Sequence, residues 1–327
     1  MARVPALAAL WLAAAAATAR AADGEAPAPV AEAGDMAPLS DGANPCEGKK
    51  PKAGFENHEC MVDAIVVALE QSGTNVTKGY TGELDAGDRV PITGSYAEEG
   101  LCPVNVHWHL GAEHLSVGQY DENGTGPSSN DGEVRLGFRC QLYDESDPKF
   151  TTPYEWKHCE NMTVGETYEI HWPHSAAGAC GTEWQMQTPF YDGVFCKDGI
   201  ISLDPLNTYK KIGVQAQVFT VVNDDSYSFP DLIKGMVVDP EKGMGVDMAM
   251  YTGSTTGTTR NNEICSRYTP ITWQVDRKCH MISASSLDKL CADMKTMKDD
   301  MSKDLHPHGA RELVDDALAA DNHQRLH

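Results

Sequence analysis

Short apolar runs separated by turn-forming residues constrain the fold of this chain more than any other feature. Beyond about residue 100 most of these runs are too short for a helix, and Gly, Pro, Asn and Asp interrupt them repeatedly. Runs of this kind, rich in β-branched and aromatic residues, are typical of strands in an extensive sheet. The sequence therefore predicts a mainly β domain. The runs assigned to strands are residues 104–110, 134–138, 168–172, 212–222 and 271–275.

Two segments show the spacing of apolar residues that is expected of a helix. In residues 60–70 this spacing is present, but the β-branched Val66 and Val67 also fit a strand. The second segment opens with a capping box at Ser285, and apolar residues then recur at i, i+3, i+4 and i+7 as far as Met301. We therefore expect one helix to follow Ser285, and we leave residues 60–70 open between helix and strand.

The first 45 residues have the composition of a targeting segment and a linker. Residues 1–21 combine Arg3, an apolar run and small residues at a cleavage site, which is the pattern of a secretory signal peptide. The apolar run is shorter than the about 20 residues that span a membrane, and no later segment is long and apolar enough. Residues 22–45 are rich in Ala and Pro and form the expected linker. This leaves residues 46–314 as the folded domain and residues 315–327 as a polar tail.

The cysteines indicate an oxidising compartment. An even number of cysteines after a signal peptide predicts disulfides, and the absence of a Cys-X-X-Cys pair argues against a thiolate metal site. Three glycosylation sequons, at Asn75, Asn123 and Asn161, agree with the secretory route. We expect the protein at the cell surface, outside the cell, or in an organelle reached through that route. The ten cysteines, whose pairing the sequence does not give, are Cys46, Cys60, Cys102, Cys140, Cys159, Cys180, Cys196, Cys265, Cys279 and Cys291.

The charge balance excludes one class of partner. The chain has 26 basic and 48 acidic residues, which give a formal net charge of −22 at pH 7. A charge of this sign and size repels the phosphate backbone of nucleic acids. We therefore expect no nucleic-acid partner.

A histidine pair provides the clearest chemical signal. His107 and His109 lie two residues apart on a predicted strand, so both rings face the same side, about 7 Å apart at Cα. A third ligand would have to come from another strand, and His171 lies in such a run, with His174 as the competing candidate. Three imidazoles leave a zinc ion one open position, which is the arrangement of a catalytic site. Taken alone, the pair also fits the half-exposed polar face of a strand.

Six of the remaining histidines have no comparable setting. None of them belongs to a pattern that brings two imidazoles together in a strand-like run. We therefore expect them at the surface. They are His158, His280, His306, His308, His323 and His327.

The residues around the histidine pair carry a family resemblance. Residues 102–114, which read CPVNVHWHLGAEH, resemble the signature of the delta-class carbonic anhydrases of marine algae, and the likeness extends over most of residues 46–314. A weaker likeness to the alpha-class enzymes implies that the third ligand is His171 and not His174. The metal is then zinc, which cobalt(II) or cadmium(II) could replace. The segments that carry the alpha-class likeness, in the order of that family, are residues 107–109, 111–114, 169–174, 251–256, 272–273 and 282–286.

The resemblance also implies a reaction. In the family, a zinc-bound hydroxide attacks carbon dioxide to give bicarbonate, so carbon dioxide and bicarbonate are the expected small-molecule substrates. A threonine accepts the hydrogen of the hydroxide and donates its own to a glutamate, and Thr255 and Glu113 resemble this pair. Because a leucine of the alpha-class pattern is missing here, Thr256 or Thr258 could take the place of Thr255. No motif assigns a residue that carries protons to the solvent.

Two further residues and the fold follow from the same resemblance. His114 resembles a buried, hydrogen-bonded histidine beside the site, and Trp273 resembles the floor of an apolar carbon dioxide pocket, although simple core packing would also explain a tryptophan. The implied fold is that of the alpha class: a large, mostly antiparallel twisted sheet with peripheral helices and the metal on its central strands. The expected biological role is the supply of inorganic carbon.

Two rival interpretations remain at this stage. A cupin-type oxygenase would use His107 and His109 with Glu113 as a further ligand to iron or manganese, but the second cupin motif is absent around His171. A secreted, disulfide-linked binding module would retain the fold with purely structural histidines. Histidine at all three ligand positions argues against such a module. The sequence therefore predicts a zinc-dependent carbonic anhydrase.

Overall fold

The computed structural model describes six segments of the chain. Several predicted features lie outside them: the signal peptide, the linker, the segment at 60–70, the polar tail and the threonines from Thr255 to Thr258. The domain bounds at 46 and 314 therefore stay predictions. The described residues are 75–80, 95–127, 136–175, 212–254, 270–297 and 301–310.

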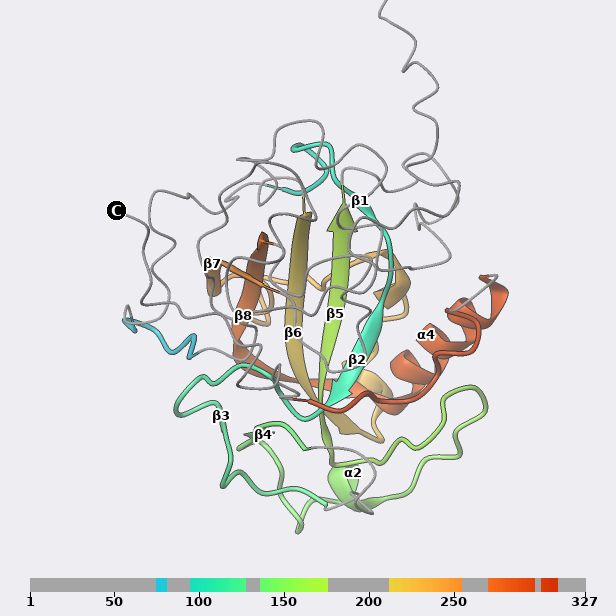
Figure 1. Cartoon of the computed structure of the whole chain (residues 1–327). Helices are drawn as coiled ribbons and strands as arrows, with labels where there is room; N and C mark the ends of the chain where they lie inside the picture. Colours follow the sequence, from blue (N-terminus) through green and yellow to red (C-terminus); the bar gives the residue numbers. More distant parts are fainter. Residues whose placement is uncertain are drawn as a thin grey trace, which may run out of the picture. The chain divides into compact units, whose positions relative to one another are not determined.

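A six-stranded sheet forms the centre of the described structure (Figure 1). The strands follow the order β1-β5-β6-β8-β7, and β2 pairs with β5 beside β1. Every pairing is antiparallel except that of β6 with β8, so the predicted mainly β fold with a mostly antiparallel sheet is confirmed. The strands are β1 (Cys102–Pro103), β2 (His107–Leu110), β5 (Thr167–Ser175), β6 (Ile212–Val222), β7 (Met248–Ser254) and β8 (Pro270–Ser283).

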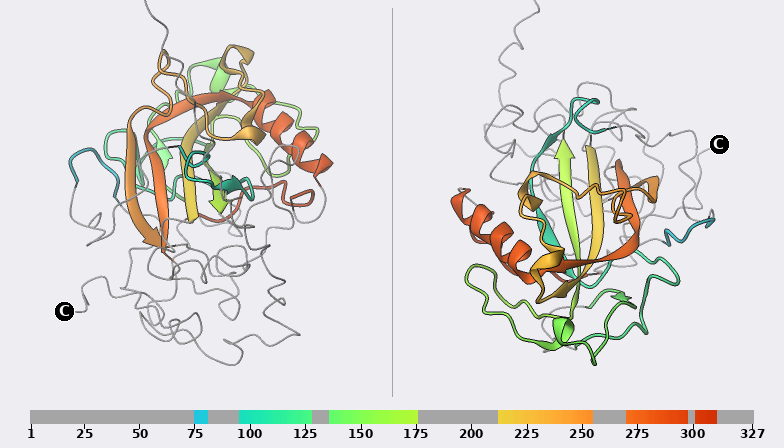
Figure 2. Two further views of the ribbon diagram at one scale, coloured as in Figure 1. Left: turned by 90° about the horizontal axis from the view of Figure 1, so that it is seen from above. Right: turned by 180° about the vertical axis from the view of Figure 1, so that it is seen from behind.

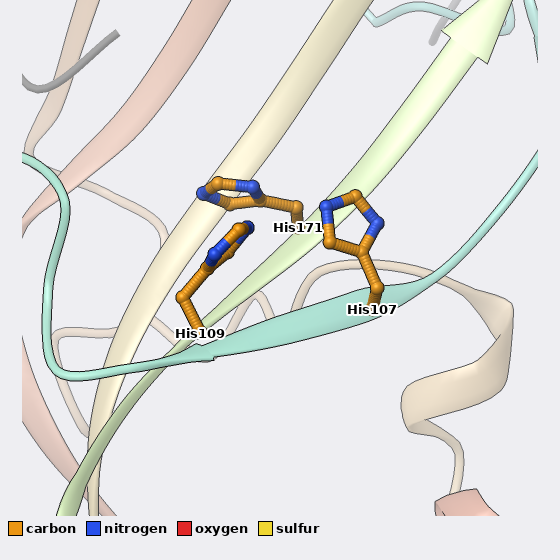
Figure 3. Close-up of side chains that lie close together, drawn as sticks. All are labelled: His107, His109 and His171. Carbon is orange, nitrogen blue, oxygen red and sulfur yellow. The ribbon is translucent and has the colours of Figure 1, made fainter. Parts of the chain in front are cut away.

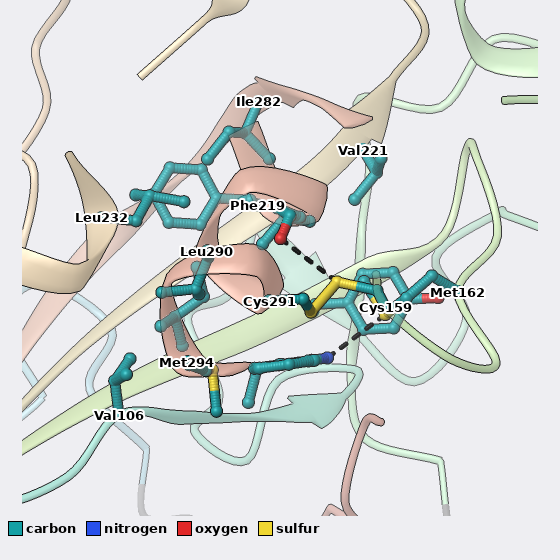
Figure 4. Close-up of a cluster of buried hydrophobic side chains, with 14 of the residues drawn as sticks. Val106, Cys159, Met162, Phe219, Val221, Leu232, Ile282, Leu290, Cys291 and Met294 are labelled. Carbon is teal, nitrogen blue, oxygen red and sulfur yellow. Dashed lines mark hydrogen bonds between the residues drawn. A yellow bond between two sulfur atoms is a disulfide. The ribbon is translucent and has the colours of Figure 1, made fainter. Parts of the chain in front are cut away.

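The two faces of the sheet have different neighbours because side chains alternate along each strand. One face carries Trp108, Ile170 and Phe219, which pack in a buried apolar cluster with helix α4 (Ala284–Thr296), as Figure 4 shows for part of the cluster. Figure 2 shows α4 on the β2 side of the sheet. On the other face of β2 and β5 lie polar side chains, and this face carries the candidate site.

The helix after β8 begins two residues earlier than the sequence predicts. Its N-cap is Ser283, whose side chain accepts a hydrogen bond from the backbone N–H of Ser286, so Ser285 is not the cap. The helix ends at Thr296, and Met301 lies beyond it although it is fully buried. Among the described residues, no helix has the length and apolar character needed to cross a membrane.

The predicted strand at residues 134–138 is wrong in its described part. Residues 136–138 belong to no strand, although Phe138 forms an isolated antiparallel bridge with Ala112. A paired strand follows directly, β4 (Arg139–Cys140), against β3 (Tyr120–Asp121). Pairing needs a partner as well as an apolar pattern, and here the partner, β3, is only two residues long. The remaining short elements are α2 (Pro148–Thr151), η4 (Asp225–Tyr227) and η5 (Leu232–Lys234).

Two disulfides join distant parts of the described chain and confirm the expected use of cysteine. Cys140–Cys279 links β4 to β8, and Cys159–Cys291 links the segment before β5 to α4. Each closes a loop of more than a hundred residues, with sequence separations of 139 and 132. Cross-links of this kind typically stabilise a fold by about 2–4 kcal/mol, because they restrict the unfolded chain.

A buried aspartate ties α4 to the segment before β5, and we expect its replacement to destabilise the protein. The carboxylate of Asp288 accepts hydrogen bonds of 2.7–3.1 Å from the backbone N–H groups of residues 157–159. Asp288→Ala leaves these donors without an acceptor and should lower the free energy of unfolding by about 2–3 kcal/mol. Urea unfolding measures the loss. Asp293→Ala, which breaks only a surface ion pair with Lys289 on the same helix, should cost less than about 1 kcal/mol, and equal losses would contradict this role.

Candidate metal centre

The three predicted ligands converge on one face of the sheet (Figure 3). His107 and His109 point the same way from β2, and His171 lies opposite His107 in the antiparallel register with β5. One ring nitrogen from each lies within 4.8 Å of the others. The ring centroids are 4.6 Å apart for His109 and His171, and 5.2 and 5.3 Å apart for the pairs that include His107. Two neighbouring strands therefore bring together three imidazoles separated by up to 64 residues in sequence.

Each of these three rings uses one nitrogen to donate a hydrogen bond to an oxygen atom. Since an oxygen of this kind can only accept, the bonded nitrogen carries the hydrogen and the other nitrogen carries the lone pair. The lone pairs then belong to Nε2 of His107, Nε2 of His109 and Nδ1 of His171. Three neutral imidazoles with fixed tautomers are a donor set that fits a divalent ion such as zinc. The three contacts are His107 Nδ1 to Asn105 Oδ1 at 2.7 Å, His109 Nδ1 to the Gly309 carbonyl at 2.8 Å, and His171 Nε2 to Glu169 Oε1 at 2.9 Å.

The surroundings keep two of the three candidate ligands uncharged. Burial lowers the pKa of His109 to about 4, and the nearby His308 ring adds to the shift. Burial also lowers the pKa of His171, although its hydrogen bond to Glu169 acts in the opposite direction. An imidazole must be neutral to bind a metal, so at neutral pH neither ring has to lose a proton before it binds one.

Glu169 is the centre of the hydrogen-bond network behind the three candidate ligands. Its fully buried carboxylate accepts hydrogen bonds from His171 at 2.9 Å, from His114 Nδ1 at 2.8 Å and from the backbone N–H of Glu113 at 2.7 Å. Burial alone would raise the pKa of Glu169, but the neighbouring His114 and the hydrogen bonds from His114 and His171 outweigh burial and hold the pKa well below its usual value. The carboxylate therefore stays ionised and fixes the ring of His171.

The predicted neighbours His114 and Trp273 lie beside this network. His114 is fully buried, and its Nε2 is 2.8 Å from the hydroxyl of Tyr251. The ring of Trp273 lies 5.0 Å from that of His114 and 5.2 Å from that of His171, and Tyr251 stacks on it. His114 thus acts on His171 through Glu169, and the indole lies against a ligand ring.

Glu113 lies beside the hydrogen-bonded nitrogens of His109 and His171. Its carboxylate oxygens are 3.5 Å from Nδ1 of His109 and 3.7 Å from Nε2 of His171, which are the nitrogens that already donate to oxygen atoms. Glu113, Glu169 and His171 are also close enough to hold a cation, but the His171 nitrogen nearest to both carboxylates, Nε2, carries the hydrogen that it donates to Glu169. The position of Glu113 therefore disfavours a cupin-type site, in which this residue would join His107 and His109 on the metal.

His174 faces away from the candidate centre. It lies three residues after His171 on β5, so it shares the opposite face of the strand with Trp172. Its Nδ1 donates to the carbonyl of Trp172 at 2.7 Å, and its ring packs against Tyr96. The structure thus brings together the three histidines implied by the family resemblance and leaves out the competing one.

The buried position of His174 makes the stability of the metal-free protein depend on pH. Burial lowers the pKa of His174 to about 4, against 6.5 in an exposed imidazole, while the hydrogen bond to the Trp172 carbonyl opposes the shift. Between these values the unfolded chain binds more protons, so the free energy of unfolding falls as pH falls. We expect His174→Gln to reduce this slope by up to about 1.4 kcal/mol per pH unit. Urea unfolding at pH 7, 6 and 5 measures it, and parallel curves for the two proteins would contradict the assignment.

One histidine that was expected at the surface, His280, is buried, whereas His308 keeps a side chain that is 38% exposed. His280 is buried and bonds to Asp276 at 2.8 Å. His308 lies at the candidate centre, with its ring 5.5 Å from that of His107 and 5.7 Å from that of His109. His308 meets ring neighbours on β2 that are far from it in sequence, whereas His280 is held by Asp276, four residues earlier on β8. Thr255 and its neighbours lie outside the described residues, so the predicted partner of Glu113 is not placed.

The sheet and its three converging imidazoles define a β protein with a candidate three-histidine metal centre. The sequence model of one family, described as Delta carbonic anhydrase, matches residues 98–286, which is more than half of the chain and includes all three histidines. The chain therefore belongs to the delta carbonic anhydrase family. No curated protein and no solved structure matches it.

Proposed function

We propose that this protein is a zinc-dependent carbonic anhydrase that interconverts carbon dioxide and bicarbonate, with His107, His109 and His171 as the zinc ligands. Family membership supports the activity and a metal. The observation that carries the ligand assignment is the set of three oxygen acceptors that direct one lone pair of each imidazole to a common point. A bound zinc ion would lower the pKa of a coordinated water to about 7 and so supply hydroxide at neutral pH.

The protein side chains around the ligands would orient the reaction. Glu169 holds the ring of His171, and its negative charge makes that ring a stronger donor. We assign Glu113 and Thr255 to the attacking hydroxide: the threonine hydroxyl accepts the hydrogen of the hydroxide and donates its own to the Glu113 carboxylate. Thr256 or Thr258 is the alternative to Thr255. Trp273, beside His171, would provide an apolar floor for carbon dioxide.

The proposed place of action is outside the cytoplasm. Two disulfides within the described residues are compatible with passage through the secretory route. Together with the signal-like residues 1–21, they support a role at the cell surface or in an organelle reached through that route. There the enzyme would supply inorganic carbon. Carbon dioxide and bicarbonate are its proposed substrates, and the strong negative charge argues against a nucleic-acid partner.

Metal analysis combined with stopped-flow hydration of carbon dioxide tests the proposal. We expect one zinc per chain, loss of hydration when a chelator removes it, and recovery with zinc or cobalt(II). The variant His109→Ala should lose both the metal and the activity. Iron or manganese without hydration would instead support a cupin-type enzyme. A folded protein that binds no metal and does not hydrate carbon dioxide would support the binding module.

A further inference from the structure

A segment beyond the family-matched region completes the metal centre. Residues 301–310, named here the closing strap, follow α4 and lie outside residues 98–286, to which the family match extends. The strap runs along the edge of β2 that β5 does not occupy, where it forms a parallel bridge opposite His109. The backbone N–H of His308 donates to the carbonyl of Trp108 at 2.8 Å, and the N–H of Leu110 donates to the carbonyl of His308 at 2.9 Å. The strand that carries two candidate ligands is thus held on both edges.

The strap also fixes one ligand directly. The carbonyl of Gly309 accepts the hydrogen of His109 Nδ1 at 2.8 Å, and this contact leaves Nε2 as the metal donor. The ring of His308 packs against those of His107 and His109, and Asp304 holds it through a contact of 2.5 Å to Nε2. The strap therefore determines which nitrogen of His109 faces the other two ligands.

Buried contacts hold the strap in place. Met301 and Leu305 belong to the apolar cluster under α4 and are 0% and 4% exposed. The carbonyl of Leu305 accepts a hydrogen bond from the backbone N–H of Glu160 at 2.8 Å, next to the Cys159–Cys291 disulfide. One end of the strap is thus fixed in the core and the other is fixed on β2.

We propose that the closing strap is a positioning element of the metal centre, which sets the tautomer and orientation of His109 through the backbone of His308 and Gly309. This proposal rests on the metal centre of the proposed function. The loss of a partner of this kind typically weakens metal binding about 10–100-fold. Displacing the strap backbone should therefore weaken zinc binding by that factor, even in a protein that stays folded.

Two substitutions at one position separate the backbone of the strap from its side chain. His308→Pro removes the N–H that bonds to Trp108, whereas His308→Ala keeps this N–H and removes only the ring. We expect His308→Pro to weaken zinc binding about 10–100-fold, measured by competition with a chromophoric chelator, and His308→Ala to weaken it much less. In nitrogen-15 histidine NMR spectra of the metal-free protein, the hydrogen on Nδ1 of His109 should persist in the wild type and in His308→Ala, and should redistribute between the two nitrogens in His308→Pro.

A second pair of variants distinguishes displacement of the strap from a general loss of stability. Leu305→Ala loosens the strap from the core, and Leu290→Ala removes a buried leucine of the same cluster from α4. Both should lower the melting temperature, but only Leu305→Ala should weaken zinc binding. Equal zinc affinities in all variants, or equal losses in the two leucine variants, would overturn the proposal. A wild-type protein that binds no zinc at all would overturn the proposed function and this proposal together.

Discussion

Replacing His171 with alanine will remove zinc from the purified protein, whereas replacing His174 with alanine will leave it bound. His171 lies across from His107 on the face that holds the candidate centre, and His174 lies on the opposite face, bonded to the Trp172 carbonyl. The loss of a direct ligand should weaken binding by more than the factor of about 10–100 that is typical of an outer partner. Zinc content after dialysis and the rate of carbon dioxide hydration measure both effects.

The two variants control for each other because they remove the same ring from the same buried strand. A general loss of stability would therefore affect both melting temperatures, while only the ligand variant should lose its metal. Loss of zinc in His174→Ala alone would show that the ligand assignment on β5 is wrong. Retention of zinc in both would show that β5 provides no ligand.

Removing Glu169 should have the largest effect on stability. Glu169→Ala leaves the rings of His114 and His171 and the N–H of Glu113 without their shared acceptor in a fully buried site. Breaking a buried charged network of this kind costs about 3–5 kcal/mol. Because the pKa of Glu169 is held below its usual value of 4.5, this contribution is fully present above pH 4.5 and is lost as pH falls below it.

Two further variants separate charge from packing at this position. Glu169→Gln preserves the volume and one acceptor oxygen, so it should lose less stability, but without the negative charge it should bind zinc about 10–100-fold more weakly. Glu160→Gln, a substitution of an exposed residue in the segment before β5, should change neither the stability nor the zinc affinity. Guanidinium unfolding of the metal-free proteins and zinc competition measure the two effects. Unchanged zinc affinity in Glu169→Gln would contradict the role assigned to the carboxylate.

Features set by local spacing could be predicted from the sequence. The two-residue spacing of His107 and His109 fixes their common direction on any strand, and the structure places both on β2. The apolar run at residues 212–222 coincides with β6, because a long β-branched run in the centre of a sheet is buried whatever its neighbours are. The choice of His171 as the third candidate ligand was predicted from a family resemblance and not from spacing.

Features set by distant partners could not be predicted. The contact that orients His109 comes from a backbone carbonyl, that of Gly309, which any residue could provide and which therefore leaves no mark in the sequence. His308 lacks a local pattern because its ring neighbours lie on β2, and the cysteine pairs depend on which loops the sheet brings together. Glu169 stood in the family-like segment, but its role became visible only through its three hydrogen-bond donors.

The closing strap also constrains the order in which the metal centre can be completed. The carbonyl that fixes His109 lies 200 residues further along the chain, so a ribosome makes the ligand strand long before it makes the group that orients one of its rings. Until residue 309 has left the ribosome, the imidazoles of β2 are present without their final geometry. Metal loading is therefore expected as a late event in the maturation of this protein, after translation of the strap and its docking on β2. The proposed zinc ion would then bind to a nearly complete fold.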